Sequence, residues 1–184
     1  MNTFQFDKCL NSRRVVKACN DEGLVCARRL DWHLNDAEDP ELLAAYMSGQ
    51  NPLITTDRAL PGEHSECIPD RNPGIIVVAF SRSIDKSRET LKTMTADAAA
   101  KILHKFKQAF PDWHKVSVCD CIIEITDKDI EVLCVENGVL RSELCLDYAK
   151  ISDWAVQLLS HLDGKSASPK RLPERPASPG DSPG

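Results

Sequence analysis

Short apolar segments alternate with helix-like segments along the first half of the chain. Strand-like runs occupy residues 3–7, 24–28, 52–56 and 74–80, and the last of these is apolar throughout. A continuous apolar run of this length is typical of a strand buried on both faces of a parallel sheet. Helix signals fall between the strands, over residues 11–23 and 39–49. This alternation predicts a mainly parallel sheet covered by helices on both faces.

The second helix has the clearest start signal. Asp39 is a candidate N-cap, Pro40 then takes the first helical position, and Glu41 places an acid in the first turn. Between the strands 52–56 and 74–80, residues 61–73 are polar and predict a loop.

The second half of the chain carries a different pattern. Apolar residues every three or four positions predict a helix over 87–110, and residues 116–125 and 130–135 flank a turn at 126–129, which predicts a β-hairpin. A last helix is predicted over 147–162. The segment 164–184 holds five of the eleven prolines and lacks apolar periodicity. The sequence therefore predicts one α/β domain over 1–162, with the hairpin and last helix as an extension over 111–162, and a disordered Pro/Ser-rich tail over 163–184.

Composition narrows the class of protein. The net charge of −5 argues against a protein that coats nucleic acid by bulk electrostatics. The longest apolar run, residues 75–80, is far shorter than the roughly 18 residues of a membrane span, so no membrane partner is expected. The N-terminus lacks the basic start and apolar core of a secretion signal, and none of the eight cysteines forms a CxxC pair. We therefore expect buried free thiols and a cytoplasmic protein.

Acidic residues follow two of the predicted strands. Asp7 and Asp57 stand at strand ends, and Asp39 and Glu41 open the helix between them. Ligand sites in open α/β sheets gather beyond the carboxyl ends of the strands. Carboxylate oxygens are the ligands that Mg²⁺ and Mn²⁺ prefer. The pattern suggests a divalent-metal site, while each acid taken alone is also explained as a plain cap of a turn or helix.

Four short motifs in order resemble the PIN-like domains, specifically the toxin-type group related to the VapC ribonucleases. Order and spacing agree over residues 1–80, with a looser match to about 110. The motifs are Phe4-Gln-Phe-Asp7-Lys-Cys-Leu10, Asp39-Pro-Glu-Leu-Leu-Ala-Ala45, Leu53-Ile-Thr-Thr-Asp57-Arg-Ala-Leu60 and Gly74-Ile-Ile-Val-Val-Ala-Phe80.

The resemblance implies a three-layer α/β/α domain that acts as a metal-dependent endoribonuclease, often the toxin of a toxin–antitoxin pair. It implies that Asp7, Asp39 and Asp57 are the catalytic metal ligands, with Glu41 replacing or assisting Asp39. The cofactor would be Mg²⁺ or Mn²⁺. The partners would be an RNA substrate, an antitoxin protein and, as a homodimer, a second copy of the chain.

The chain departs from the family pattern beside the first acid. Many relatives place a second acid directly after it, whereas Lys8 and Cys9 stand here. A fourth acid has only positional candidates, namely Glu63, Asp70 and Asp85. These departures, with the acidic C-terminal half, leave open a catalytically weakened or inactive PIN-like protein that binds a protein partner through the hairpin over 116–135. An α/β nucleotide-binding regulator is a third class.

Cysteine and histidine give weaker signals. Cys119-Asp-Cys121 and His64-Ser-Glu-Cys67 resemble fragments of a zinc site, but they fit no common ligand spacing. In an extended strand, Cys119 and Cys121 would share one face with Ile123, which favours thiols in the core.

Overall fold

A seven-stranded mixed sheet forms the centre of the protein. The computed structural model describes residues 3–7, 17, 25–28, 38–48, 52–80, 96–109 and 117–167. The strand order is β2-β1-β3-β4-β5-β6-β7; the first five strands are parallel, and β6 and β7 are antiparallel to their neighbours. The strands are β1 (Thr3–Phe6), β2 (Val25–Arg28), β3 (Leu53–Thr55), β4 (Ile75–Val78), β5 (Ile122–Ile125), β6 (Asp129–Glu136) and β7 (Val139–Asp147). The predicted α/β class with a mostly parallel sheet is confirmed.

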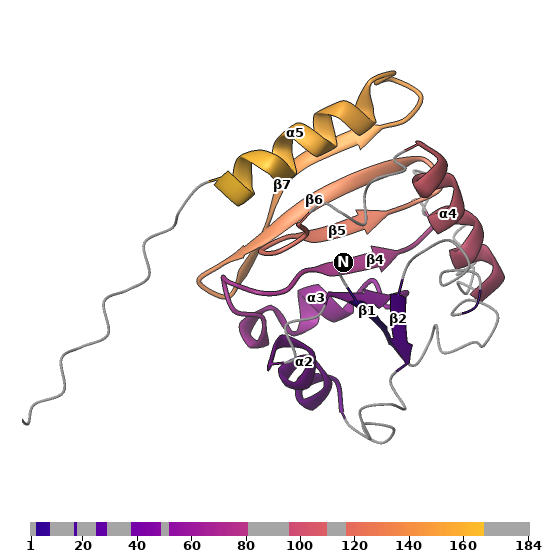
Figure 1. Cartoon of the computed structure of the whole chain (residues 1–184). Helices are drawn as coiled ribbons and strands as arrows, with labels where there is room; N and C mark the ends of the chain where they lie inside the picture. Colours follow the sequence, from indigo (N-terminus) through magenta and orange to yellow (C-terminus); the bar gives the residue numbers. More distant parts are fainter. Residues whose placement is uncertain are drawn as a thin grey trace, which may run out of the picture.

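Helices pack against the sheet from two sides (Figure 1). The larger core cluster includes residues of α4 and α5, and the smaller one includes residues of α2 and α3. The helices are α2 (Asp39–Ser48), α3 (Leu60–Glu63), the 3-10 helix η3 (Ser65–Cys67), α4 (Ala96–Ala109) and α5 (Trp154–Ala167). The predicted helix over 11–23 lies outside the described residues except for Lys17, and residues 87–95 of the predicted third helix lie outside them as well.

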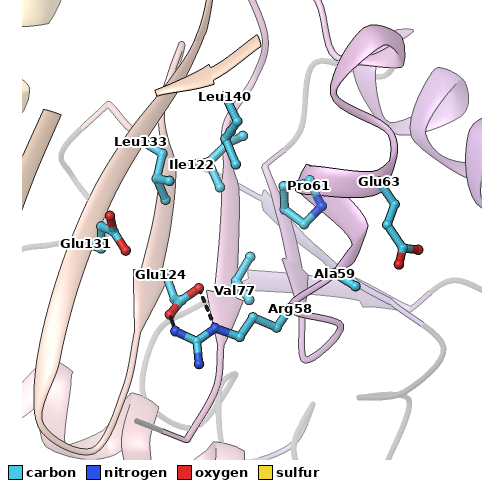
Figure 2. A pocket seen from close by; sticks show the side chains of 11 residues that line it. Arg58, Ala59, Pro61, Glu63, Val77, Ile122, Glu124, Glu131, Leu133 and Leu140 are labelled. Atoms are coloured by element: carbon cyan, nitrogen blue, oxygen red, sulfur yellow. Dashed lines mark hydrogen bonds and ion pairs between the residues drawn. The ribbon is translucent and has the colours of Figure 1, made fainter. Parts of the chain in front are cut away.

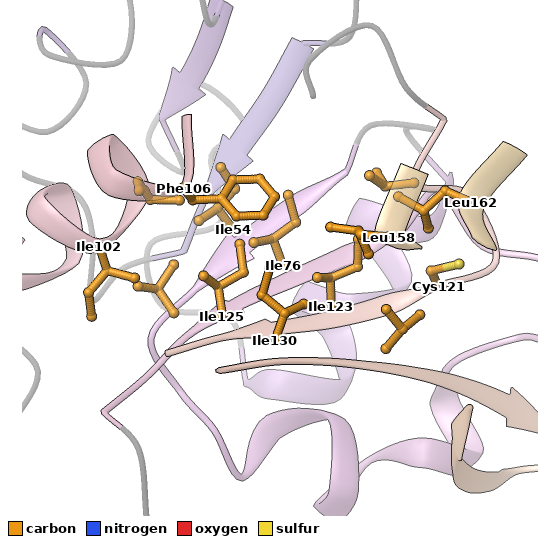
Figure 3. Packing of buried hydrophobic residues seen from close by; sticks show 14 of the residues in the cluster. Ile54, Ile76, Ile102, Phe106, Cys121, Ile123, Ile125, Ile130, Leu158 and Leu162 are labelled. Atoms are coloured by element: carbon orange, nitrogen blue, oxygen red, sulfur yellow. The ribbon is translucent and has the colours of Figure 1, made fainter. Parts of the chain in front are cut away.

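Alternation along the central strands divides the core between the two faces. In β4, Ile76 and Val78 belong to the larger cluster, whereas Ile75 and Val77 belong to the smaller one. Successive side chains of a strand point to opposite faces, so a strand covered on both sides is apolar at every position. Figure 3 shows the larger cluster, in which Phe106 of α4 and Leu158 of α5 pack on the isoleucines of the sheet.

The predicted hairpin is present as β5 and β6, and β7 extends it to a three-stranded antiparallel meander. β7 was not predicted, because Arg141, Ser142 and Glu143 interrupt its apolar pattern. The β6–β7 register shifts between Val132 and Leu133, so that Leu144 and Ser142 have partners in β6 and Glu143 has none. This bulge breaks the period of two on which a prediction of the strand would depend.

The other differences concern shorter segments. The predicted loop over 61–73 contains α3 and η3. The first helical hydrogen bond of α2 runs from Leu42 N to Glu38 O, which makes Glu38 rather than Asp39 the N-cap. α5 begins at Trp154 and ends at Ala167, seven and five residues later than predicted, so residues 163–167 of the predicted tail are helical; residues 168–184 lie outside the described part.

A charged cluster joins α5 to the bulge of β7. The Glu143 carboxylate accepts a hydrogen bond from Lys165 and lies 3.2 Å from Nε2 of His161. Burial opposes ionisation of Glu143, but hydrogen bonds from Lys165, Cys134 and His161 outweigh it and lower the pKa of this carboxyl. Burial likewise opposes the charge on Lys165, whose pKa is nevertheless raised by Glu143 and nearby thiols.

We predict that Glu143→Gln destabilises the protein by up to about 1 kcal/mol at neutral pH. A carboxyl with a lowered pKa stabilises the fold above its unfolded pKa, roughly 4.3, and this contribution is lost as the pH falls through the folded value. The raised pKa of Lys165 gives the opposite pH dependence. Its contribution to stability is present below the unfolded pKa of lysine, roughly 10.4, and is lost at higher pH. Urea unfolding of the wild type and the variant should differ at pH 7 and converge near pH 3. Glu136→Gln, which alters an exposed ion pair with Arg141, is the matched control.

No helix in the described part of the chain has both the length and the apolar character needed to cross a membrane.

Candidate functional site

The chain reverses its direction of winding between β1 and β3. These two strands are parallel neighbours, with Gln5 beside Leu53 and Phe6 beside Ile54. β2 follows β1 along the chain and lies on one side of this pair, whereas β4 follows β3 and lies on the other. Such a switch point leaves a crevice at the carboxyl ends of the two strands, where open α/β sheets bind their ligands. Asp7 and Thr55 stand at these ends.

Asp7 is held in place by β3. Its backbone N donates to Ile54 O at 2.9 Å, and its Oδ2 accepts a hydrogen bond from Thr55 Oγ1 at 2.7 Å. Asp7 is 8% exposed and Thr55 is fully buried. The threonine hydroxyl also accepts a hydrogen bond from Asp57 N at 2.9 Å. The carboxylate is therefore oriented at the switch point before any ligand binds.

Asp57 caps the turn that leads into α3. Its Oδ1 accepts hydrogen bonds from Ala59 N at 3.0 Å and from Leu60 N at 3.3 Å, and the residue is exposed. This is the capping role that the sequence left open. A role as metal ligand stays a prediction.

Asp39 and Glu41 are exposed in the first turn of α2. Asp39 Oδ2 lies 3.9 Å from Nε2 of His64, the residue that follows α3. Within the described ranges, no three or more His, Cys, Asp or Glu side chains are grouped closely enough to hold a metal ion. Asp7, Asp39, Asp57 and Glu41 thus do not form a complete cage of protein ligands.

The structure describes two of the three candidates for a fourth acid, Asp70 and Glu63. Asp70 Oδ1 accepts a hydrogen bond from Asn137 N at 3.0 Å, so this carboxylate joins η3 to the β6–β7 turn. Glu63 is exposed at the end of α3. Asp85, Lys8 and Cys9 lie outside the described residues.

An ion pair that the sequence analysis missed joins three strand ends. Arg58 Nε donates to Glu124 Oε2 at 2.9 Å, and Nη2 donates to Oε1 of the same carboxylate (Figure 2). Arg58 Nη1 also donates to Phe80 O at 3.3 Å. The guanidinium therefore connects the ends of β3, β4 and β5. An acid among the isoleucines of β5 was the available signal, since a buried carboxylate requires a partner.

A pocket of about 300 Å³ lies on the same side of the sheet as this ion pair. Its apolar lining includes Val77, Ile122, Leu133 and Leu140, and α3 forms the opposite wall (Figure 2). Besides Glu124, the lining includes two further carboxylates, Glu131 of β6 and the exposed Glu63 of α3. The lining residues that come from β5, β6 and β7 lie beyond the PIN-like motifs.

Five cysteines are free thiols: Cys67, Cys119, Cys121, Cys134 and Cys145. Cys121 is buried, and burial raises its pKa to about 11, so it is an unreactive core thiol as expected. Cys119 is exposed, which corrects the expectation of a core position. The strand begins at Ile122 rather than at residue 116, and Cys119 stands in a turn in which Asp120 has φ 61°.

Searches for similar proteins give no match of any kind: no family model, no curated protein and no solved structure is significantly similar to the chain. The likeness to PIN-like ribonucleases therefore rests on the four sequence motifs and stays a prediction.

Proposed function

We propose that the protein is a metal-dependent endoribonuclease of the PIN-like type, the toxin of a toxin–antitoxin pair, with a three-layer α/β/α domain. The observation that carries the proposal is Asp7, a carboxylate nine-tenths buried at the switch point and oriented by Thr55. A buried, oriented acid at a crevice is a common arrangement for ligand binding in open sheets.

The residues at this edge fit Mg²⁺ or Mn²⁺ bound with few protein ligands. Mg²⁺ usually keeps several waters and takes one or two carboxylates together with substrate phosphates. Asp7 supplies one such carboxylate, and the hydrogen bond from Thr55 is the kind of support that metal-binding carboxylates have. Asp57, Asp39 and Glu41 are the candidates for the second ligand.

The bound ion would supply charge stabilisation and an activated water for cleavage of a phosphodiester. The chain's own contribution is to fix the Asp7 carboxylate at the strand end and to position RNA against it. An antitoxin protein would then control the enzyme, and a second copy of the chain is a further proposed partner.

We predict that Asp7→Asn reduces Mn²⁺-dependent cleavage of single-stranded RNA to about one hundredth and weakens Mn²⁺ binding. The reason is that a neutral amide replaces the carboxylate nearest the switch point. Calorimetry or electron paramagnetic resonance of Mn²⁺ measures binding, and a fluorescent RNA measures cleavage. Thr55→Val, which leaves the acid but removes its hydrogen bond, should reduce both by roughly tenfold.

Asp70→Asn is the matched control, because Asp70 is an acid bonded to a backbone amide away from the switch point. It should leave Mn²⁺ binding and cleavage unchanged. Wild-type protein that folds normally but neither binds Mn²⁺ nor cleaves RNA would contradict the proposal. Asp57→Asn then decides whether this acid binds metal in addition to capping α3.

A second candidate function is a non-catalytic PIN-like protein that binds a protein partner. It is favoured by the lack of a three-ligand group among the described side chains and by the Arg58–Glu124 ion pair. In that case the wild type shows no Mn²⁺ binding, and variants of the Asp7 edge change neither RNA cleavage nor partner binding.

A further inference from the structure

The pocket between α3 and the C-terminal strands has apolar walls and more carboxylates than cations in its lining. Leu133 and Leu140 come from β6 and β7, and Ile122 lies beside them on β5 (Figure 2). A volume of about 300 Å³ stands at the low end of the range for small-molecule pockets, which suits one long side chain.

Two glutamates lie side by side on neighbouring strands in the lining of this pocket. Glu124 and Glu131 are directly opposite in the antiparallel register of β5 and β6. Like charges in this position repel and destabilise a sheet. Arg58 pairs with Glu124, whereas the half-buried side chain of Glu131 makes no hydrogen bond or ion pair with any described residue. Within the described part of the chain, no cation is therefore paired with Glu131 beside the apolar wall.

We propose that this pocket binds an arginine side chain of a partner polypeptide. The aliphatic stem of arginine would pack on Leu133 and Leu140, and its guanidinium would pair with Glu131. The guanidinium would also relieve the repulsion between Glu131 and Glu124. Planar guanidinium is weakly hydrated and matches a carboxylate with two hydrogen bonds, which makes arginine a better occupant than lysine.

A polypeptide is the favoured source of this side chain because of what lies beside the pocket. β7 is the outer strand of the described sheet, and Val139 at its start is 56% exposed. An outer strand offers unpaired backbone groups to an extended peptide. The proposal does not depend on the Asp7 edge, because none of Asp7, Asp39, Glu41 and Asp57 lines the pocket.

The test is a titration with N-acetyl-arginine amide, followed by methyl NMR of Leu133, Leu140, Val77 and Ile122. Saturable shifts of these methyl groups are expected, with millimolar affinity for so small a probe. N-acetyl-citrulline amide, a neutral molecule of the same shape, should bind at least ~10-fold more weakly, because its ureido group donates hydrogen bonds to Glu131 without the positive charge that strengthens them. N-acetyl-lysine amide should fall between the two.

Two variants separate this site from general attraction of cations. Glu131→Gln should weaken binding of the arginine probe by about tenfold. It should not lower the unfolding midpoint, because it removes a like-charge contact, so loss of folding does not confuse the result. Glu136→Gln, on the same strand but outside the pocket, should leave affinity unchanged. Equal binding of the arginine and citrulline probes, or equal effects of the two variants, would overturn the proposal.

Discussion

Gly74→Ala is expected to destabilise the protein by roughly 3–5 kcal/mol. Gly74 has φ 102°, a conformation that side chains with a Cβ rarely adopt. A Cβ at this position would lie 2.3 Å from Val118 O, which is backbone and has no rotamer to change. Gly74 N also donates to Asn72 Oδ1, and Gly74 O accepts from Leu53 N, so the glycine is held at the start of β4 from both sides.

Urea unfolding measures the loss of stability in the variant. A variant with too little folded protein for an unfolding curve to be fitted would also agree with the expected loss. Gly62→Ala is the matched control, since nothing lies within 4 Å of a Cβ there. It should change stability by less than about 1 kcal/mol, and in the favourable direction because alanine prefers a helix. A Gly74→Ala protein as stable as the Gly62→Ala protein would show that the contact with Val118 is relieved by movement of the loop.

Arg58→Leu is expected to destabilise the protein by about 3 kcal/mol. The change leaves Glu124, whose side chain is 11% exposed, without its cation and directly opposite Glu131. Removing one partner of a buried pair costs more than the pair contributes, because the remaining charge stays desolvated and loses the attraction of its counter-ion. The hydrogen bond to Phe80 O is lost as well.

A double-mutant cycle isolates this ion pair. Arg58→Leu combined with Glu124→Leu should recover most of the loss, because the double variant no longer buries the Glu124 carboxylate without Arg58. Arg141→Leu is the control: its pair with Glu136 has side chains 64% and 48% exposed, so the cost should stay below about 1 kcal/mol. If Arg58→Leu costs no more than Arg141→Leu, the Arg58–Glu124 pair is solvated in solution and does not stabilise the ends of the strands.

The parallel part of the fold could be predicted because each strand there is buried on both faces. Residues 75–78 are apolar at every position, and a run of this kind has few alternatives to a central strand. The start of α2 was misplaced by one residue because Glu38, Asp39 and Glu41 are all acceptable near a helix start. The meander was predicted only in part, since β7 is exposed at most positions and interrupted by a bulge.

The candidate site, like the fold, could be predicted from the sequence only in part. Asp7 could be chosen from sequence because it directly follows an apolar strand, and the parallel pairing of β1 and β3 brings it to Thr55. The ion pair of Arg58 with Glu124 joins residues 66 positions apart; the acid among the isoleucines of β5 indicates that a partner exists, but no local pattern identifies Arg58 as that partner. The prediction that Asp7, Asp39 and Asp57 together hold a metal ion still awaits the Mn²⁺ experiment.

The α/β class, the parallel strands and the acids at their ends follow from the amino-acid sequence alone, because they depend on local periodicity and on the position of a residue within its own segment. The complete fold was needed to show that Thr55 orients Asp7, that Arg58 pairs with Glu124, and that no described residue pairs with the Glu131 side chain beside the apolar pocket. Each of these depends on the register between strands and on which helix covers which face, and contacts of that kind are set by packing across the whole sheet.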